Sequence, residues 1–223
     1  VLLLSMNVAN AQDDELSDEE LEAIAQRDMM EYMVMHAPVR FDKDLQVGTK
    51  LVYRSRDDEN EINSVEVIKD TLDAFWIKEE VDENVFFYLI SRNSGELLDL
   101  KGYDDEGNFR HPEMVNNSER ETIRHKREEK KESLKSKNIV TVETERIEYS
   151  LDNKNYSCKQ ISNSYSQEGE NILISEEIPR MLPFSFSLEL ELFYNAFNEE
   201  REGLLRSHST ELIEIEMEGN YEE

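Results

Sequence analysis

The chain has 223 residues, and its 25 Lys and Arg stand against 52 Asp and Glu, for a formal net charge of −27. This length is sufficient for one substantial hydrophobic core. So acidic a chain disfavours binding to nucleic acid and to anionic membrane surfaces. A basic partner, divalent cations or a saline habitat remain compatible with it.

The first eleven residues have the features of an export signal. Residues 1–8, VLLLSMNV, have the composition of the end of an apolar signal core, and Ala9-Asn10-Ala11 matches a cleavage site. We therefore expect a signal-peptide remnant over 1–11 and an exported protein, periplasmic or secreted, of a Gram-negative-type bacterium. A buried N-terminal strand is the alternative. No later run approaches ~18 apolar residues, so no transmembrane segment is expected.

An acidic leader and a helix are predicted over residues 12–37. Ser17 and Glu20 are spaced as a capping box, in which each side chain bonds the other's main-chain amide. The helix is expected to run from about Asp18 to Met35, because Pro38 should end it.

The predicted helix has an apolar face that is rich in methionine towards its C-terminal end. The face comprises Leu21, Ile24, Ala25, Met29, Met30, Tyr32, Met33 and Met35. Methionine fills irregular gaps, so we expect this end to pack against a curved sheet. A methionine-rich surface that grips a ligand or partner is the alternative.

Residues 38–217 are predicted to form one β domain. Apolar residues alternate there with a period of two, and acidic or glycine-containing turns separate short runs, as in an antiparallel meander. The run at 85–90 is apolar on both faces, which indicates a central strand covered on each side. The last strand is expected from Leu205 to Met217, and residues 218–223 form a frayed tail.

Residues 119–137 break this pattern as a charged insertion. They carry eight Lys and Arg against five Glu, and only Ile123 and Leu134 are strongly apolar. A solvated helix or a charged loop is expected. As the net-basic part of an acidic chain, the segment is also a candidate patch for an acidic partner.

The sequence offers no recognisable catalytic or metal-binding set. The four histidines form no zinc motif, and the single Cys158 is expected to be a small buried hydrophobe. His36, near the end of the predicted helix, is assigned a capping or dipole role. We therefore expect no enzyme, no cofactor and no metal, although convergence of distant side chains stays open.

A loop is predicted at Ile178–Pro183, because Pro179 and Pro183 lack the amide that a central strand needs. Its context, TVETERIEYSLDNKNYSCKQIS, then ENILISEEIPRMLPFSFSLELE, then STELIEIEME, resembles exported bacterial proteins of unknown function that are similar to the outer-membrane lipoprotein carrier and receptor family. QVGTKLVYRS and VEVIKDTLDAFWIKEE also resemble that family's opening strands. Leu173 departs from the pattern, since an aromatic residue is common there.

The resemblance covers residues 38–217 and implies a mainly β (α+β) fold. In that fold a single curved antiparallel sheet, a half-barrel of about 9–11 short strands, wraps over the N-terminal helix.

Two functions are expected. The first is a non-enzymatic binding module for an apolar ligand such as a lipid or acyl chain, in a cavity lined by Met30, Met33, Trp76, Phe87, Phe184 and Phe186. The alternative is a structural or interaction protein of the cell envelope, which binds a protein partner through its acidic surface or through 119–137. A cavity of ~300 Å³ or more between helix and sheet favours the first.

Overall fold

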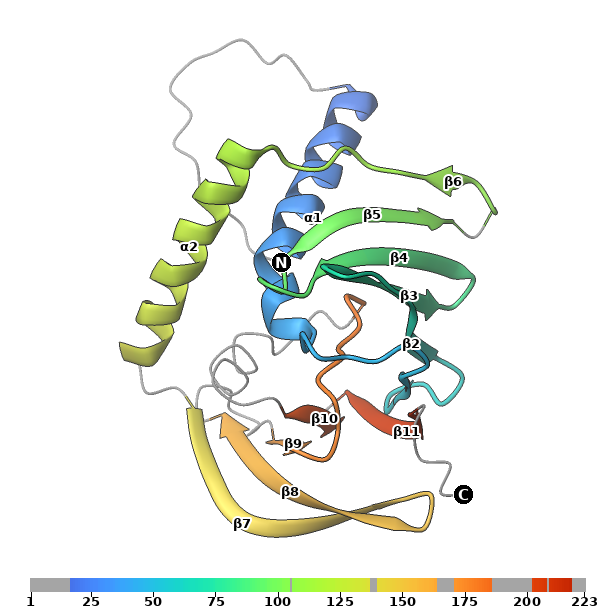
Figure 1. Cartoon of the computed structure of the whole chain (residues 1–223), viewed down its shortest axis with the longest axis vertical. Helices are drawn as coiled ribbons and strands as arrows, with labels where there is room; N and C mark the ends of the chain where they lie inside the picture. Colours follow the sequence, from blue (N-terminus) through green and yellow to red (C-terminus); the bar gives the residue numbers. More distant parts are fainter. Residues whose placement is uncertain are drawn as a thin grey trace.

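The computed structural model describes residues 17–104, 106–136, 140–163, 171–185, 202–207 and 209–217. The predictions for the signal remnant 1–11, for leader residues 12–16, for Phe186 and for the tail 218–223 lie outside these residues. Within them the chain forms two helices and eleven strands (Figure 1). Their bounds are α1 Asp18–Arg40, β1 Lys50–Ser55, β2 Ile62–Asp70, β3 Ala74–Val81, β4 Asn84–Ser91, β5 Leu97–Tyr103, β6 Phe109–Arg110, α2 Asn117–Ser136, β7 Val140–Leu151, β8 Lys154–Asn163, β9 Asn171–Ser175, β10 Gly203–Arg206 and β11 Thr210–Glu216.

The strands form one antiparallel sheet, as predicted. Their order is β6-β5-β4-β3-β2-β1-β11-β10-β9-β8-β7, so most neighbours in the sheet are also consecutive along the chain. The exception is β11, which returns to pair with β1, as in Leu51 opposite Ile215. The sheet is not closed, and its two edges are β6 and β7.

The prediction of one last strand from Leu205 to Met217 is wrong, because β10 and β11 are separate. The main-chain amide of Ser207 donates to the carbonyl of Thr210 at 2.7 Å, and the amide of Thr210 donates to Oγ of Ser207 at 3.1 Å. This turn reverses the chain, and Arg206 then pairs with Glu211. A serine hydroxyl that bonds nearby main chain competes with extended structure.

Helix α1 begins directly after Ser17, as predicted, but it continues through Pro38 to Arg40. The predicted end before Pro38 is therefore wrong. Pro38 lies in the last turn, so it removes a single amide from the helix. The last turn also buries Ala37 and Val39, which are 0% and 4% exposed, and this burial stabilises it.

The core lies between one face of the sheet and the second half of α1. Met30, Met33, Val34 and Ala37 of α1 belong to one buried cluster with Phe75 and Ile77 of β3 and Tyr88 and Ile90 of β4. Leu21, Ile24 and Met29 of the first half are exposed, and Figure 1 shows that end of α1 extending past the strands. The predicted apolar face is thus buried only from Met30 onward.

The predicted proline loop is confirmed: it crosses from β9 to the end of α1. Leu182 N donates to the carbonyl of Arg40 at 3.0 Å, and the amides of Phe184 and Ser185 donate to the Glu79 carboxylate at 2.8 and 2.9 Å. The fully buried Arg40 donates through Nη1 to the carbonyl of Pro183. The loop is thereby fixed against both the helix and the sheet.

Candidate functional site

A groove separates α1 from the segment that leads into α2. Its main pocket has a volume of about 450 Å³ and is lined by Ala23, Gln26, Arg27, Met30, Pro112, Glu113, Met114, Val115, Asn116 and Glu119. A second pocket of about 210 Å³ shares Arg27, Val115 and Glu119 with the first and continues between the two helices towards Ile123 and Lys126. We call the two pockets together the interhelical groove.

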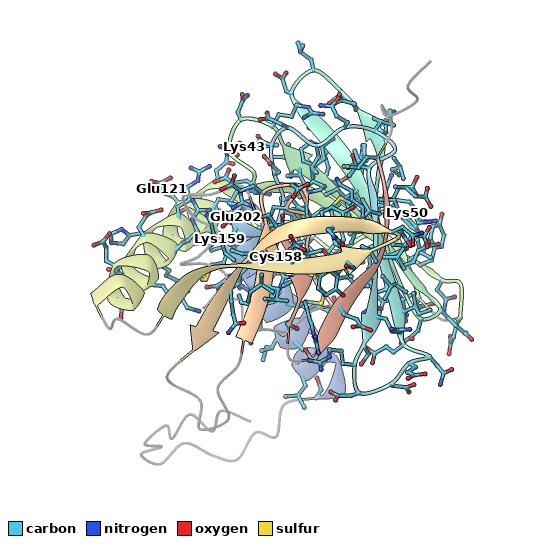
Figure 2. The ribbon with its side chains drawn as sticks, turned by 90° about the horizontal axis from the view of Figure 1, so that it is seen from below. Lys43, Lys50, Glu121, Cys158, Lys159 and Glu202 are labelled. Atoms are coloured by element: carbon cyan, nitrogen blue, oxygen red, sulfur yellow. The ribbon has the colours of Figure 1, made fainter. Side chains whose placement is uncertain are left out.

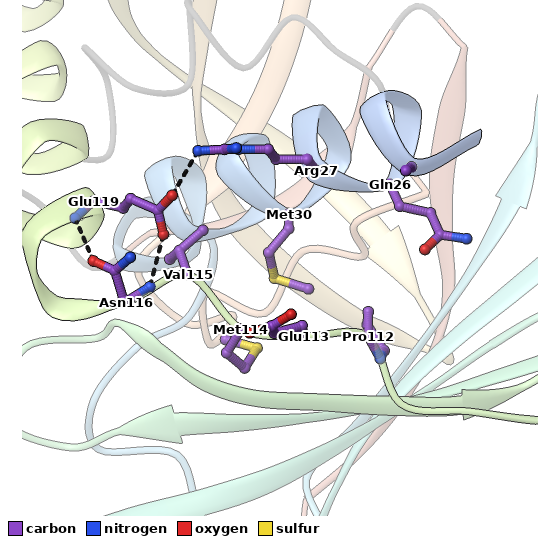
Figure 3. Close-up of a pocket in the computed structure, with 10 residues that line it drawn as sticks. Gln26, Arg27, Met30, Pro112, Glu113, Met114, Val115, Asn116 and Glu119 are labelled. Atoms are coloured by element: carbon purple, nitrogen blue, oxygen red, sulfur yellow. Dashed lines mark hydrogen bonds and ion pairs between the residues drawn. The ribbon is translucent and has the colours of Figure 1, made fainter. Parts of the chain in front are cut away.

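The interhelical groove is lined by both apolar and polar side chains. Figure 3 shows the side chain of Met30 directed from α1 towards Met114, with Val115 beside it. Arg27 donates to Oε1 of Glu119 at 2.6 Å, and this ion pair joins the two helices where the pockets meet.

The start of α2 is fixed by a capping box. Oδ1 of Asn116 accepts from the amides of Ser118 and Glu119 at 2.9 and 3.1 Å, and Oε2 of Glu119 accepts from the amide of Asn116 at 2.9 Å. The sequence analysis missed this cap, although Asn-x-x-Glu at 116–119 is a recognisable signal. Glu119 therefore links the cap of α2 to Arg27 of α1.

The charged insertion is a helix, which was one of the two predicted alternatives. Ile123 is its one fully buried apolar residue among the side chains that the structure describes, at 4% exposure. Polar contacts also hold α2 against the sheet. Arg124 donates to both carboxylate oxygens of Glu96 at 2.6 and 2.9 Å, and Arg120 donates to the carbonyl of Leu97 at 2.7 Å. Lys126 pairs with Glu31 of α1.

These contacts bear on the proposed partner patch at 119–137. Arg120, Arg124 and Lys126 face groups of the protein itself, so their positive charge is already partly compensated. The hydrogen bonds from Arg124 also lower the pKa of the Glu96 carboxyl, against the opposing effect of its partial burial.

His36 is buried in α1, where it packs on Tyr32 with ring centroids 4.4 Å apart. Burial, followed by the nearby charges of Lys130, Arg40 and Arg127, lowers its pKa to about 3. The imidazole is therefore neutral near pH 7, and the predicted dipole role, which needs a charged ring, is wrong.

The predicted lining residues separate into three places. Met30 and Met33 both belong to the buried core, and Met30 also lines the groove. Phe184 packs on Phe41 and Tyr88, with ring centroids 5.6 and 4.9 Å apart. Trp76 and Phe87 alternate with Phe75 and Tyr88 along their strands, so they lie on the opposite face of the sheet, where Lys101 is 4.3 Å from the Trp76 ring. Phe186 is outside the described residues.

A third pocket, of about 240 Å³, is lined by residues of β8, of β9 and of the segments that follow β9 and precede β10, among them Cys158, Lys159 and Glu202. Figure 2 labels these three residues. Cys158 is buried as predicted, and burial raises the pKa of its thiol to about 11. Lys159 pairs at 2.7 Å with Glu202, whose side chain is 1% exposed. A thiol so rarely ionised is a poor nucleophile.

Within the described ranges, no three or more His, Cys, Asp and Glu side chains are grouped so that they could hold a metal ion. Neither described helix has the length and apolar character needed to cross a bilayer. Comparisons with protein-family models, curated proteins and solved structures found no match to this chain. Among the described residues, the interhelical groove holds the largest of these three pockets and is the candidate site.

Proposed function

We propose that this chain is a non-enzymatic binding module of an exported cell-envelope protein, and that the interhelical groove takes an apolar ligand such as a lipid or acyl chain. The single observation that carries the proposal is the pocket of about 450 Å³, whose lining includes the apolar residues Ala23, Met30, Met114 and Val115. This volume lies within the range of ligand sites, which begins at ~300 Å³.

The wider expectations belong to the same proposal. The open antiparallel sheet with α1 packed on one face is compatible with a half-barrel of the lipoprotein carrier and receptor type. Export to the periplasm or the exterior would supply acyl chains as ligands. The alternative is a protein partner bound through the acidic surface or α2. The case for α2 is weaker, because Arg124 and Lys126 already form ion pairs within the protein.

The expected affinity follows from burial of methylene groups. Each buried methylene contributes ~0.8 kcal/mol, so about ten of them supply ~8 kcal/mol. Association costs at least ~4 kcal/mol of this gain, so burial of the chain alone supplies at most ~4 kcal/mol, which is a dissociation constant of about 1 mM. The polar end of the ligand would lie against Gln26 and the Arg27–Glu119 pair.

A fluorescent dodecanoic acid, titrated into the purified protein, tests the proposal. Ala23→Trp should fill the groove and abolish binding, because Ala23 lines the pocket. Ala25→Trp is the matched control: Ala25 is exposed on the same helix but points about 200° away and does not line the groove. Equal binding by both variants, or no binding by the unaltered protein, contradicts the proposal.

A further inference from the structure

The two edges of the sheet differ in length and in protection. The β6 edge has two residues, and beside it the carbonyl of Leu97 at the start of β5 accepts a hydrogen bond from Arg120 of α2. The β7 edge has twelve residues, Val140–Leu151, a length of ~40 Å. Figure 1 shows β7 as the outermost ribbon, and in the part of the chain that the structure describes only β8 pairs with it.

The turn between β7 and β8 determines which main-chain groups point outward. Asp152 and Asn153 both have positive φ, of 50° and 64°, so they form a two-residue turn of type I′. The flanking residues Leu151 and Lys154 then form a hydrogen-bonded pair, and bonded pairs alternate along the ladder. The N–H and C=O groups of Glu148 and Ser150 therefore point away from β8.

The stretch Ile147–Leu151 is well suited to accept another strand. Ile147, Tyr149 and Leu151 pack against the core, whereas Glu148 and Ser150 are exposed, so the outward groups are accessible on a firmly held strand. A register shift between Glu143 and Ile147 separates this stretch from the rest of β7. Proline and lysine, which commonly block an edge, are absent from β7.

The acidic charge of β7 and of the whole chain indicates which kind of strand can pair with this edge. The sequence of β7 holds Glu143, Glu145 and Glu148 against Arg146, within a chain of net charge −27. A second copy added at this edge would place acidic strands side by side and bring two strongly negative molecules together, both of which are unfavourable. A strand that carries Lys or Arg at alternate positions is complementary.

We propose that the free edge of β7 at Ile147–Leu151 binds an extended basic segment of a partner protein by strand addition. Hydrogen bonds with the main chain of Glu148 and Ser150 supply the pairing, and cationic side chains opposite Glu148 supply selectivity. This inference concerns the end of the sheet remote from the interhelical groove and does not depend on the proposed lipid function.

A synthetic ten-residue peptide that alternates Lys with Val, labelled with a fluorophore, tests this by anisotropy, with an alternating Glu–Val peptide as control. We expect the Lys–Val peptide to bind and to slow amide exchange at Glu148 and Ser150. Ser150→Pro removes one outward N–H and no main-chain bond to β8; like Ser150→Ala, it also removes the hydrogen bond from Oγ of Ser150 to Oδ1 of Asn155 on β8. It should weaken binding roughly fivefold, as for the loss of one hydrogen bond of ordinary strength.

Ser150→Ala is the matched control, because it keeps the main-chain donor and should bind as the unaltered protein does. Glu148→Gln separates charge from pairing: it should lower affinity while exchange at Ser150 remains protected. Absence of peptide binding, unchanged binding by Ser150→Pro with its fold intact by circular dichroism, or equal binding of the Glu–Val peptide overturns the proposal. If the unaltered protein self-associates and Ser150→Pro abolishes this, the proposal is also overturned, because the edge then binds a second copy of this chain.

Discussion

The neutral imidazole of His36 is a case in which burial determines the chemistry of a residue. His36 is 4% exposed, and the charges that act on its ring, those of Lys130, Arg40 and Arg127, are all positive. Both effects oppose a second positive charge on the ring, and together they lower the pKa from 6.5 to about 3. Within the described residues, Nδ1 of His36 has no hydrogen-bond partner that would offset them.

This pKa predicts a loss of stability in mild acid. Between pH 6.5 and about 3 the unfolded chain binds a proton at His36 that the folded chain does not, so the free energy of unfolding falls as the pH falls. Urea unfolding at pH 7 and pH 5 should show the unaltered protein losing ~2 kcal/mol more than His36→Phe, which cannot titrate. Parallel losses in the two proteins would show that His36 ionises freely in the folded state.

At the scale of the element, α2 is held by polar contacts more than by apolar burial. Ile123 is buried, while Arg124, Arg120 and Lys126 bond Glu96, the carbonyl of Leu97 and Glu31. Ion pairs of this kind are partly exposed to water and are weakened by salt. The helix is therefore expected to loosen without unfolding of the sheet.

We predict that Glu96→Gln speeds amide exchange in α2. The change removes one charge of the Glu96–Arg124 pair, whose arginine side chain is 45% exposed, so the expected loss is ~1 kcal/mol, or about fivefold in exchange rate. Exchange in β1–β4 should not change. Glu121→Gln is the control, because Glu121 pairs with the same arginine while its own side chain is 77% exposed. Similar rates in both variants would show that apolar packing holds α2.

At the scale of the whole molecule, local patterns predicted the strands but did not place their faces. Alternation along β3 and β4 shows that Phe75 and Trp76, or Phe87 and Tyr88, lie on opposite faces. It does not say which face meets α1, and the sequence analysis predicted that Trp76 and Phe87 would line the cavity between helix and sheet. The helix covers the face of Phe75, Ile77, Tyr88 and Ile90 instead.

Long-range contacts account for the other differences. Arg40 is the last residue of α1 and would ordinarily be solvated, but it is buried because Pro183, 143 residues later, supplies a carbonyl acceptor. The groove likewise joins residues 23–30 to 112–119, which no local pattern relates. A long-range contact also explains why residue 203 is glycine. A Cβ atom there would lie 2.6 Å from the carbonyl oxygens of Ile178 and Pro179, which is too close.

The most direct measurement for the proposed binding module is photo-crosslinking with a dodecanoic acid that carries a diazirine at its methyl end, followed by peptide mass spectrometry. The label should attach to Met30, Met114 or Val115, which are apolar residues that line the interhelical groove. Excess unlabelled dodecanoic acid should prevent it. Two results would contradict the proposed site. One is attachment around Trp76 and Phe87, on the opposite face of the sheet, and the other is labelling that the unlabelled dodecanoic acid does not reduce.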